Sequence, residues 1–244
     1  MAFAGHRENN ASPVPDEFRS MITELKPRRS LAPLLMTASL VLCCRTSAWS
    51  QEAPARLIPP PVLNGPSQPG HEEKADLAGG CYWGTQGLFE HVKGVERVVA
   101  GFSAGHSDFD GGAESVMITF DPKVISYARL LQIFFSVVQD PTQLNRQGPD
   151  VGRGYRSEIF YLDGRQRRIA QAYLAQLDRA KVFPKPIVTG IDPYSTFDPV
   201  GLSQQDFMRK HPRLEYIEIN DVPKLASLKR LFPAYYRADP LRYR

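Results

Sequence analysis

Cysteine is scarce in this sequence, since 244 residues contain only Cys43, Cys44 and Cys81. Three cysteines cannot form a disulfide framework in a chain of this length, and no Cys/His spacing resembles a zinc site. The one marked apolar run, 31–44, is shorter than the ~20 residues that span a bilayer. Charge of neither sign dominates, because 30 basic and 26 acidic residues are scattered along the chain. These features exclude wholesale disorder and carry no nucleic-acid signature.

The apolar run is part of a longer pattern that is typical of a secretory signal peptide. Basic residues at 26–29 precede the run 31–44, and the small residues Ala48 and Ser50 stand at −3 and −1 before Gln51. Export to the periplasm is the expected localisation. A signal anchor that stays attached is the alternative.

We expect four segments. Residues 1–50 are an N-terminal extension and signal peptide, with Met1 or Met21 as the start. A proline-rich linker covers 51–73, the catalytic domain 74–237 and a C-terminal tail 238–244. Cleavage after Ser50 leaves 244 − 50 = 194 residues, and Cys81 becomes the only cysteine.

Hydrophobic periodicity in the folded part predicts alternating strands and helices. The expected strands are 75–78, 95–102, 115–120, 157–162 and 187–191, and the expected helices are 83–92, 126–138, 165–181, 203–210 and 222–231. Ser126 is the expected N-cap of its helix. The order β-α-β-β-α-β predicts an α+β fold, a ferredoxin-like two-layer sandwich with a mixed β-sheet and helices packed on one face.

Cys81 lies in a glycine-rich turn between a predicted strand and a predicted helix, within Gly79-Gly80-Cys81-Tyr82-Trp83-Gly84. A helix N-terminus favours the thiolate, which is the nucleophilic form of cysteine. The glycines permit a sharp turn and close approach of another molecule. The alternative interpretation is a buried, inert cysteine that is kept for packing.

The segment Gly80-Cys81-Tyr82-Trp83-Gly84 resembles the GCFWG signature of the A-type peptide-methionine (S)-S-oxide reductase family. Further similar segments follow in the family's order: Ala113–Val116, Asp121–Tyr127, Asp140–Thr142, Asn145–Gly152, Tyr155–Ser157, Lys185–Thr189 and Tyr216–Asp221. The resemblance covers roughly 74–237. It identifies the chain as a divergent, single-cysteine member of that family.

The resemblance implies reduction of methionine-S-sulfoxide, protein-bound or free, through a sulfenic acid on Cys81. Glu114 would donate a proton to the sulfoxide oxygen, and Tyr82 and Trp83 would hold the S-methyl group. The resemblance also implies that Asp150 and Tyr155 are polar residues that line the substrate pocket. No cofactor or metal is expected. The partners are oxidised proteins or peptides and an external thiol (a thioredoxin-like protein, glutathione or glutaredoxin, or dithiothreitol), with no nucleic acid, and the protein is expected to be a monomer.

The chain departs from the family pattern at several points. The segment 101–114 is shortened and lacks a tyrosine, and Gly112 replaces a histidine. Gln204 and Phe207 stand where the family has His and Tyr, so a pocket hydroxyl is expected to be lost. Two further replacements are Gln86 for Glu and Gly154 for Gln.

These departures keep a second hypothesis open, a degenerate protein that binds methionine sulfoxide with little turnover. A general thiol-disulfide oxidoreductase is disfavoured because no second cysteine forms a C-x-x-C pair with Cys81. A Cys-His hydrolase that uses His106 lacks a recognisable third member. The basic residues of 165–185 and the aromatic tail 235–244 are interpreted as a solvated face and a docked terminus.

Overall fold

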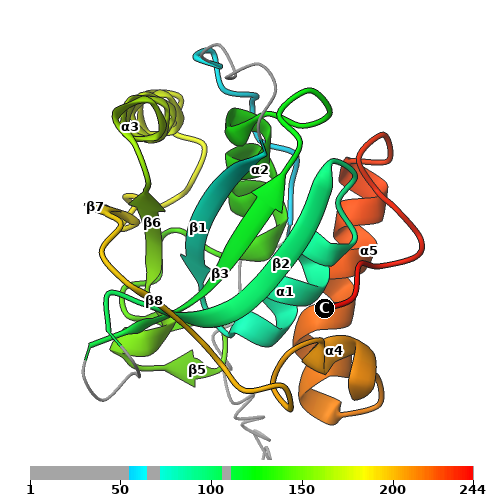
Figure 1. The fold of residues 1–244 in the computed structure, drawn as a ribbon. Helices are drawn as coiled ribbons and strands as arrows, with labels where there is room; N and C mark the ends of the chain where they lie inside the picture. The colour runs from blue at the N-terminus through cyan, green and yellow to red at the C-terminus, as the bar shows by residue number, and fades with distance from the viewer. Residues whose placement is uncertain (1–54, 65–71, 106–110, 244) are drawn as a thin grey trace, which may run out of the picture. The chain divides into compact units, whose positions relative to one another are not determined.

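The computed structural model describes residues 55–64, 72–105 and 111–243, which are coloured in Figure 1. The predicted signal peptide and His106 lie outside these described residues. Within the described ranges, no helix combines the length and the apolar character that crossing a bilayer requires.

A six-stranded mixed β-sheet forms the centre of the fold, in the order β7-β6-β1-β3-β2-β8. Its strands are β1 (Glu73–Gly79), β2 (Val95–Ser103), β3 (Ala113–Phe120), β6 (Ser157–Tyr161), β7 (Gly190–Pro193) and β8 (Phe197–Pro199). Neighbouring strands are antiparallel except β6 and β7, which run parallel. A separate two-stranded hairpin joins β4 (Arg146–Gln147) to β5 (Asp150–Val151). The first four strands that the sequence predicted are confirmed.

The fifth predicted strand, 187–191, begins later than expected, at Gly190. Just before this point the chain has a different partner, because the N–H of Val188 donates a hydrogen bond to the carbonyl of Pro141 at 2.8 Å. Strand β8 was not predicted from the sequence. It has only three residues and includes Asp198 and Pro199, which are residue types that strands disfavour.

The helices are α1 (Tyr82–Glu90), α2 (Tyr127–Ile133), α3 (Gly164–Arg179), α4 (Phe207–Lys210) and α5 (Val222–Leu231). The predicted cap is confirmed, since the Ser126 side chain accepts a hydrogen bond from the N–H three residues later at 3.2 Å. Helix α2 continues as a π-helical turn, Phe134–Val138, where the sequence predicted α-helix. The helix predicted for 203–210 is shorter than expected, because the chain forms turns up to Asp206.

One apolar core lies between the sheet and the helices, and Figure 1 shows α1 and α2 on the same face of the sheet. Alternate strand residues face this core because successive side chains of a strand point to opposite faces. Leu77 of β1 and Val116 and Ile118 of β3 are fully buried there, against Leu88 and Phe89 of α1. The packing explains why the helices cover this face.

The sheet is strongly curled. Strands β7 and β8 lie at its opposite edges, yet only residues 194–196 separate them in sequence. A residue spans at most about 3.5 Å, so these edges lie within roughly 14 Å of each other where the connection runs. Figure 1 shows the end of β2 bending back towards β6 and β7. The curl encloses the face of the sheet that is turned away from α1 and α2.

Residues 55–64, within the predicted proline-rich linker, form no helix or strand but pack on the domain. Ile58 is buried, and its carbonyl accepts a hydrogen bond from the Gln132 amide of α2 at 2.7 Å. The hydroxyl of Tyr173 in α3 donates to the carbonyl of Pro59 at 2.8 Å. This part of the linker is therefore attached to the domain by specific hydrogen bonds.

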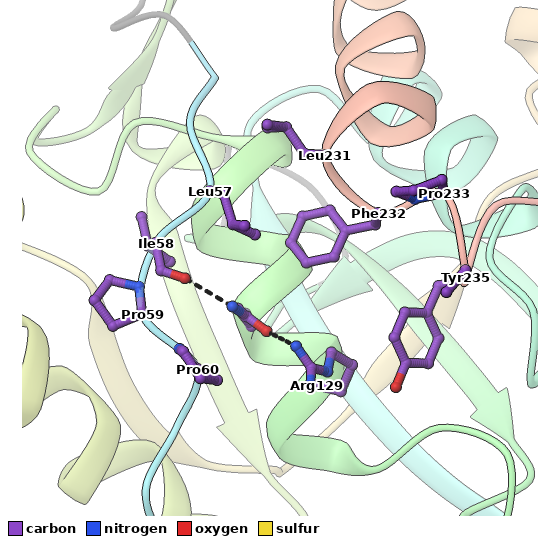
Figure 2. Close-up of a pocket in the computed structure, with 11 residues that line it drawn as sticks. Leu57, Ile58, Pro59, Pro60, Arg129, Leu231, Phe232, Pro233 and Tyr235 are labelled. Carbon is purple, nitrogen blue, oxygen red and sulfur yellow. Dashed lines mark hydrogen bonds between the residues drawn. The ribbon is translucent and has the colours of Figure 1, made fainter.

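A pocket of about 540 Å³ lies beside this segment, between α2 and the end of α5 (Figure 2). Its walls are mainly apolar, with Leu57 and Ile58 on one side and Phe232 on the other. Arg129 and Tyr235 are also part of its lining, and the guanidinium lies 5.3 Å from the centre of the phenol ring. None of the residues predicted for catalysis lines this pocket.

A polar cluster is buried on the enclosed face of the sheet. Asp76 alternates with core residues of β1, and its carboxyl accepts a hydrogen bond from the Ser103 hydroxyl at 2.6 Å. The hydroxyls of Ser103 and Ser115 are 2.7 Å apart. Burial raises the pKa of Asp76 to about 7, although both serines stabilise its charge, and Glu158 adds repulsion. The curl therefore removes a carboxyl from water.

We expect Asp76→Asn to stabilise the protein above neutral pH. The folded protein keeps a proton that the unfolded chain releases near pH 3.8, so the free energy of unfolding falls as pH rises from about 4 to about 7. The amide that replaces the carboxyl does not titrate, so the variant should have a free energy of unfolding higher by on the order of 1–4 kcal/mol at pH 8. Urea unfolding of both proteins at pH 4.5 and pH 8 measures this difference. The exposed Asp178→Asn is the control, and equal stability differences at both pH values would contradict the prediction.

Candidate active site

Cys81 stands at the turn between β1 and α1, where the sequence placed it. It is the N-cap residue of α1, and its side chain makes no capping hydrogen bond. Its carbonyl accepts hydrogen bonds from the N–H and the hydroxyl of Thr85, at 3.4 and 3.2 Å. The thiol is free and half-buried. The first turn of α1 therefore holds the cysteine backbone in place.

Two glycines of the pentapeptide are required by their surroundings. Gly80 has φ +88°, which favours glycine, and a Cβ there would lie 2.6 Å from Cβ of Gln147. At Gly84 a Cβ would lie 2.0 Å from a carboxyl oxygen of Asp221. The second glycine thus lets a buried carboxyl from the C-terminal part of the chain approach the first turn of α1.

Glu114 of β3 reaches the N-terminus of α1. Its Oε2 accepts a hydrogen bond from the N–H of Tyr82 at 3.0 Å. That N–H is one of the donors in the first turn that have no partner within a helix. The partial positive charge of the helix N-terminus is therefore directed to the Glu114 carboxyl as well as to the neighbouring thiol.

The thiol of Cys81 holds its proton more tightly than a free cysteine. Burial raises the pKa of Cys81 well above its ordinary value, and the charges of Glu114, Asp221 and Asp150 raise it further. A hydrogen bond from the backbone of Trp83 acts in the opposite direction but is the smaller influence. The helix N-terminus acts in the predicted direction, through the backbone N–H of Trp83, but desolvation and the surrounding carboxyls outweigh it and raise the pKa of Cys81 overall.

The indole of Trp83 is held by residues from the last part of the chain. Its Nε1–H donates to Oε1 of Gln204 at 2.9 Å, and Phe207 stacks on the ring at 3.8 Å and 11°. Tyr216 meets it edge to face at 5.8 Å between centroids. Tyr82, the other predicted wall residue, lies nearly perpendicular to the indole at 6.3 Å. The two rings therefore lie beside one another, and the residues that hold the indole were not visible in the local sequence; contact with the substrate stays a prediction.

Tyr216 is a site residue that the sequence reasoning missed. Its hydroxyl donates a hydrogen bond to Oδ2 of Asp150. Burial raises the pKa of Tyr216, and the proximity of Cys81 and then of Asp150 raises it further, so the phenol stays neutral. The similar segment Tyr216–Asp221 was the available signal, but it assigned no role to the tyrosine. One phenolic group therefore lies close enough to Cys81 to interact with it electrostatically, despite the replacement at Phe207.

Asp150 and Tyr155 come from the long loop that follows α2. Gln147 closes this loop, because its amide exchanges hydrogen bonds with the backbone N–H and carbonyl of Asp140, at 3.0 and 2.9 Å. The tight hairpin then presents Asp150 to the Tyr216 hydroxyl. Tyr155 is half-buried and ends a 3-10 turn that packs against β3. Its contact with the substrate remains a prediction.

The site brings together one thiol, carboxyl groups and a phenol. Within the part of the chain that the structure describes, no group of three or more His, Cys, Asp or Glu side chains is arranged to hold a metal. The groups present can exchange protons with one another, and the sulfur can attack an electrophilic atom. This is the set of groups that a cysteine-dependent enzyme requires.

Comparison with known proteins identifies the family. A family described as peptide methionine sulfoxide reductase matches residues 73–234. Peptide methionine sulfoxide reductase MsrA 2 of Mesorhizobium japonicum is 50% identical over 179 residues, which cover 69% of this chain and 92% of the relative. The protein of the same name from Synechocystis is 41% identical over 198 residues, covering 76% and 92%. The reduced form of Mxr1 from Saccharomyces cerevisiae is similar in structure, with a TM-score of 0.52 and 25% identity over 60% of this chain and 90% of that chain.

This chain belongs to the peptide methionine sulfoxide reductase family. Its similar relatives are MsrA enzymes, and its reaction is the reduction of methionine sulfoxide. The resemblance inferred from the sequence motifs is confirmed. The fold is confirmed as α+β, with a six-stranded, strongly curled mixed sheet and helices packed on it.

We expect alkylation of Cys81 by iodoacetamide to have a pH midpoint above the ~8.5 of an unperturbed cysteine. Glu114→Gln should lower this midpoint, because it removes the charge with the largest raising effect on the pKa of Cys81. The alkylation rate is followed by mass spectrometry of the peptide that contains Cys81. Glu218→Gln, at an exposed position, is the control. A midpoint at or below that of free cysteine would refute this electrostatic picture.

Proposed function

We propose that this enzyme reduces the S epimer of methionine sulfoxide, protein-bound or free, through a sulfenic acid on Cys81, and thereby repairs oxidised proteins. The observation that carries the proposal is the convergence of Cys81, Glu114 and Tyr216 at the N-terminus of α1. Reduction of methionine sulfoxide follows from family membership, whereas the epimer and the role of each residue are part of this proposal.

In the first step, the sulfur of Cys81 attacks the sulfoxide, and the oxygen passes from the methionine sulfur to the cysteine. Two electrons move from Cys81 to the substrate sulfur, and the products are methionine and a protonated sulfenic acid. Glu114 relays the proton to the sulfoxide oxygen as the S–O bond of the substrate breaks. The raised pKa of Cys81 suits this step, because the proton that the oxygen needs is already in the site.

Tyr216 and Asp150 assist by polarising the sulfoxide. A neutral phenol can donate a hydrogen bond to the oxygen as negative charge develops on it. The Asp150 carboxyl holds the hydroxyl of Tyr216, and Tyr155 from the same loop lines the pocket. Tyr82 and Trp83 form the apolar surface for the S-methyl group.

An external thiol regenerates the enzyme. The thiol attacks the sulfenic sulfur of Cys81, a mixed disulfide forms and water leaves. A second thiol then releases Cys81, and the external pair departs as a disulfide. Cys81 is the only cysteine outside residues 43–44, so a chain cleaved after Ser50 has no second thiol of its own for this step. A thioredoxin-like protein, glutathione with glutaredoxin, or dithiothreitol has the required chemistry.

A protein that binds methionine sulfoxide without turnover is the second candidate. The replacements at Gln204 and Phe207 motivate it, since each removes a group that the family pattern places in the pocket. The hydroxyl of Tyr216 beside Cys81 favours turnover, because it retains one phenolic donor.

Two broader features belong to the same proposal. The strand order β6-β1-β3-β2 with α1 and α2 on one face supports the ferredoxin-like assignment for the core. The residue pattern of 26–50 supports export to the periplasm, with loss of the segment up to Ser50. N-terminal sequencing of the secreted protein tests this cleavage.

The function is tested with the purified protein, a peptide that carries either sulfoxide epimer, and dithiothreitol. We expect only the S epimer to be reduced and Cys81→Ser to be inactive, because it removes the nucleophile. Without a thiol, one equivalent of methionine should form and Cys81 should gain one oxygen by mass spectrometry. Substrate affinity without oxygen on Cys81 would establish the binding protein instead.

Tyr216→Phe should lower kcat by about 10- to 100-fold and leave KM within a fewfold, because the lost hydrogen bond acts mainly in the transition state. Steady-state kinetics with the S-sulfoxide peptide and saturating dithiothreitol measures both constants. Tyr194→Phe, at a tyrosine that is 41% exposed, provides the matched control. An unchanged kcat in Tyr216→Phe would remove the phenol from the mechanism.

A further inference from the structure

The segment 204–207, which ends at the first residue of α4, contacts Trp83 through its first and last side chains. Gln204 accepts the indole hydrogen bond at 2.9 Å, and Phe207 stacks on the ring at 3.8 Å. The two residues between them, Gln205 and Asp206, are buried at 0% and 4% exposure. The two residues that touch the indole therefore flank two buried residues, Gln205 and Asp206, which attach the segment to the rest of the domain.

Gln205 anchors the segment 204–207 to strand β2. Its Oε1 accepts from the N–H of Ala100 at 3.0 Å, and its Nε2 donates to the carbonyls of Ala100 and Val200 at 2.8 and 3.1 Å. A carboxamide thus pairs with both backbone groups of Ala100, in the manner of a strand residue, just beyond the end of β8. Reversal of this amide would break these bonds, so its orientation is determined.

Gln86 of α1 forms hydrogen bonds to both Gln205 and Asp206. It is fully buried, and its Nε2 donates to Oε1 of Gln205 at 2.9 Å and to the carbonyl of Val98 at 3.3 Å. Its Oε1 accepts from the N–H of Asp206 at 3.0 Å. Asp206 has φ 53°, a left-handed conformation that is unfavourable for a non-glycine residue and persists only where the surroundings enforce it. The bonds to Gln86 are part of that enforcement.

We propose that Gln86 is a positioning residue for methionine sulfoxide: through Gln205 and Asp206 it fixes the segment that orients the Trp83 indole towards the substrate methyl group. Gln86 and Trp83 both lie in α1, one turn apart. The segment 204–207 therefore touches α1 at two points, at the Trp83 indole and at the Gln86 amide. This inference rests on the proposed function, because it assumes that Trp83 contacts the substrate.

A carboxamide is suited to this position because it donates and accepts at once. Replacement by leucine removes both functions and leaves the Gln205 oxygen and the Asp206 N–H with fewer partners, which is costly in a buried site. The resemblance to the family makes Glu the common residue here. A protonated carboxyl could replace the amide, whereas an ionised one would face the Gln205 oxygen without a proton to donate.

The test uses the full chain with Trp49→Phe, which leaves Trp83 as the only tryptophan. We expect Gln86→Leu to change the emission spectrum of Trp83 and to raise KM for the S-sulfoxide peptide about tenfold, the effect of one lost buried hydrogen bond. Gln132→Leu is the matched control, because Gln132 is an equally buried glutamine that bonds to Ile58 instead. It should lower thermal stability without changing the emission or KM.

Gln86→Glu separates positioning from stability and applies even where Gln86→Leu does not fold. Its KM should be close to that of the unmodified enzyme at pH 5.5 and raised at pH 8, as the new carboxyl ionises. Asp206, which bonds to Gln86 through its backbone, and Glu90, one turn further along α1, are the acidic groups beside this position. Arg209 acts on both of them, and Lys210 acts on Glu90. Burial, and then Asp206, raises the pKa of Glu90 to about 9, so Glu90 stays protonated over this range.

The inference is overturned if Gln86→Leu loses stability while its emission and KM match the control, or if the relative KM of Gln86→Glu is independent of pH. Trp83→Leu distinguishes this failure from failure of the proposed site. If Trp83→Leu raises KM and the Gln86 variants do not, only the positioning role is wrong. If Trp83→Leu leaves KM unchanged, the substrate site itself is misplaced.

Discussion

The hydrogen bond from the N–H of Tyr82 to Glu114 is the interaction on which the active site depends. It joins the turn after β1 to β3, the central neighbour of β1 in the sheet. The same bond places a carboxyl beside Cys81 and satisfies a donor at the start of α1. Because Glu114 lies in the strand that places Val116 and Ile118 in the core, the position of the carboxyl follows from the packing of the sheet.

Around this link, the site balances burial against charge. Desolvation and the nearby carboxyls keep the proton on Cys81 and on Tyr216 in the free protein. A thiol that keeps its proton is a weaker nucleophile, but it also carries the proton that a sulfoxide oxygen must receive. In the mechanism proposed above, this arrangement suits a concerted transfer with the substrate present better than storage of a reactive thiolate.

Local patterns were sufficient for much of the fold. Hydrophobic alternation located β1, β2, β3 and β6, and the cap at Ser126 marked the start of α2 correctly. The reasoning failed where structure depends on distant partners. Strand β8 is too short and too rich in unfavourable residues to be recognised, and it exists because β2 pairs with it. The net shift in the pKa of Cys81 was not predictable for the same reason, since the carboxyls that raise it come from other parts of the chain.

The sequence by itself determined the family, the order of the main elements and the likeness of Cys81 and Glu114 to a nucleophile and an acid, because these depend on short motifs and local spacing. Only the tertiary structure decided how the last third of the chain completes the site. Tyr216 reaches Cys81 across 216 − 81 = 135 positions, and Gln204 and Phe207 hold an indole more than 100 positions earlier. The curl of the sheet and the buried bonds of Gln86 bring these segments together, and no local pattern records such contacts.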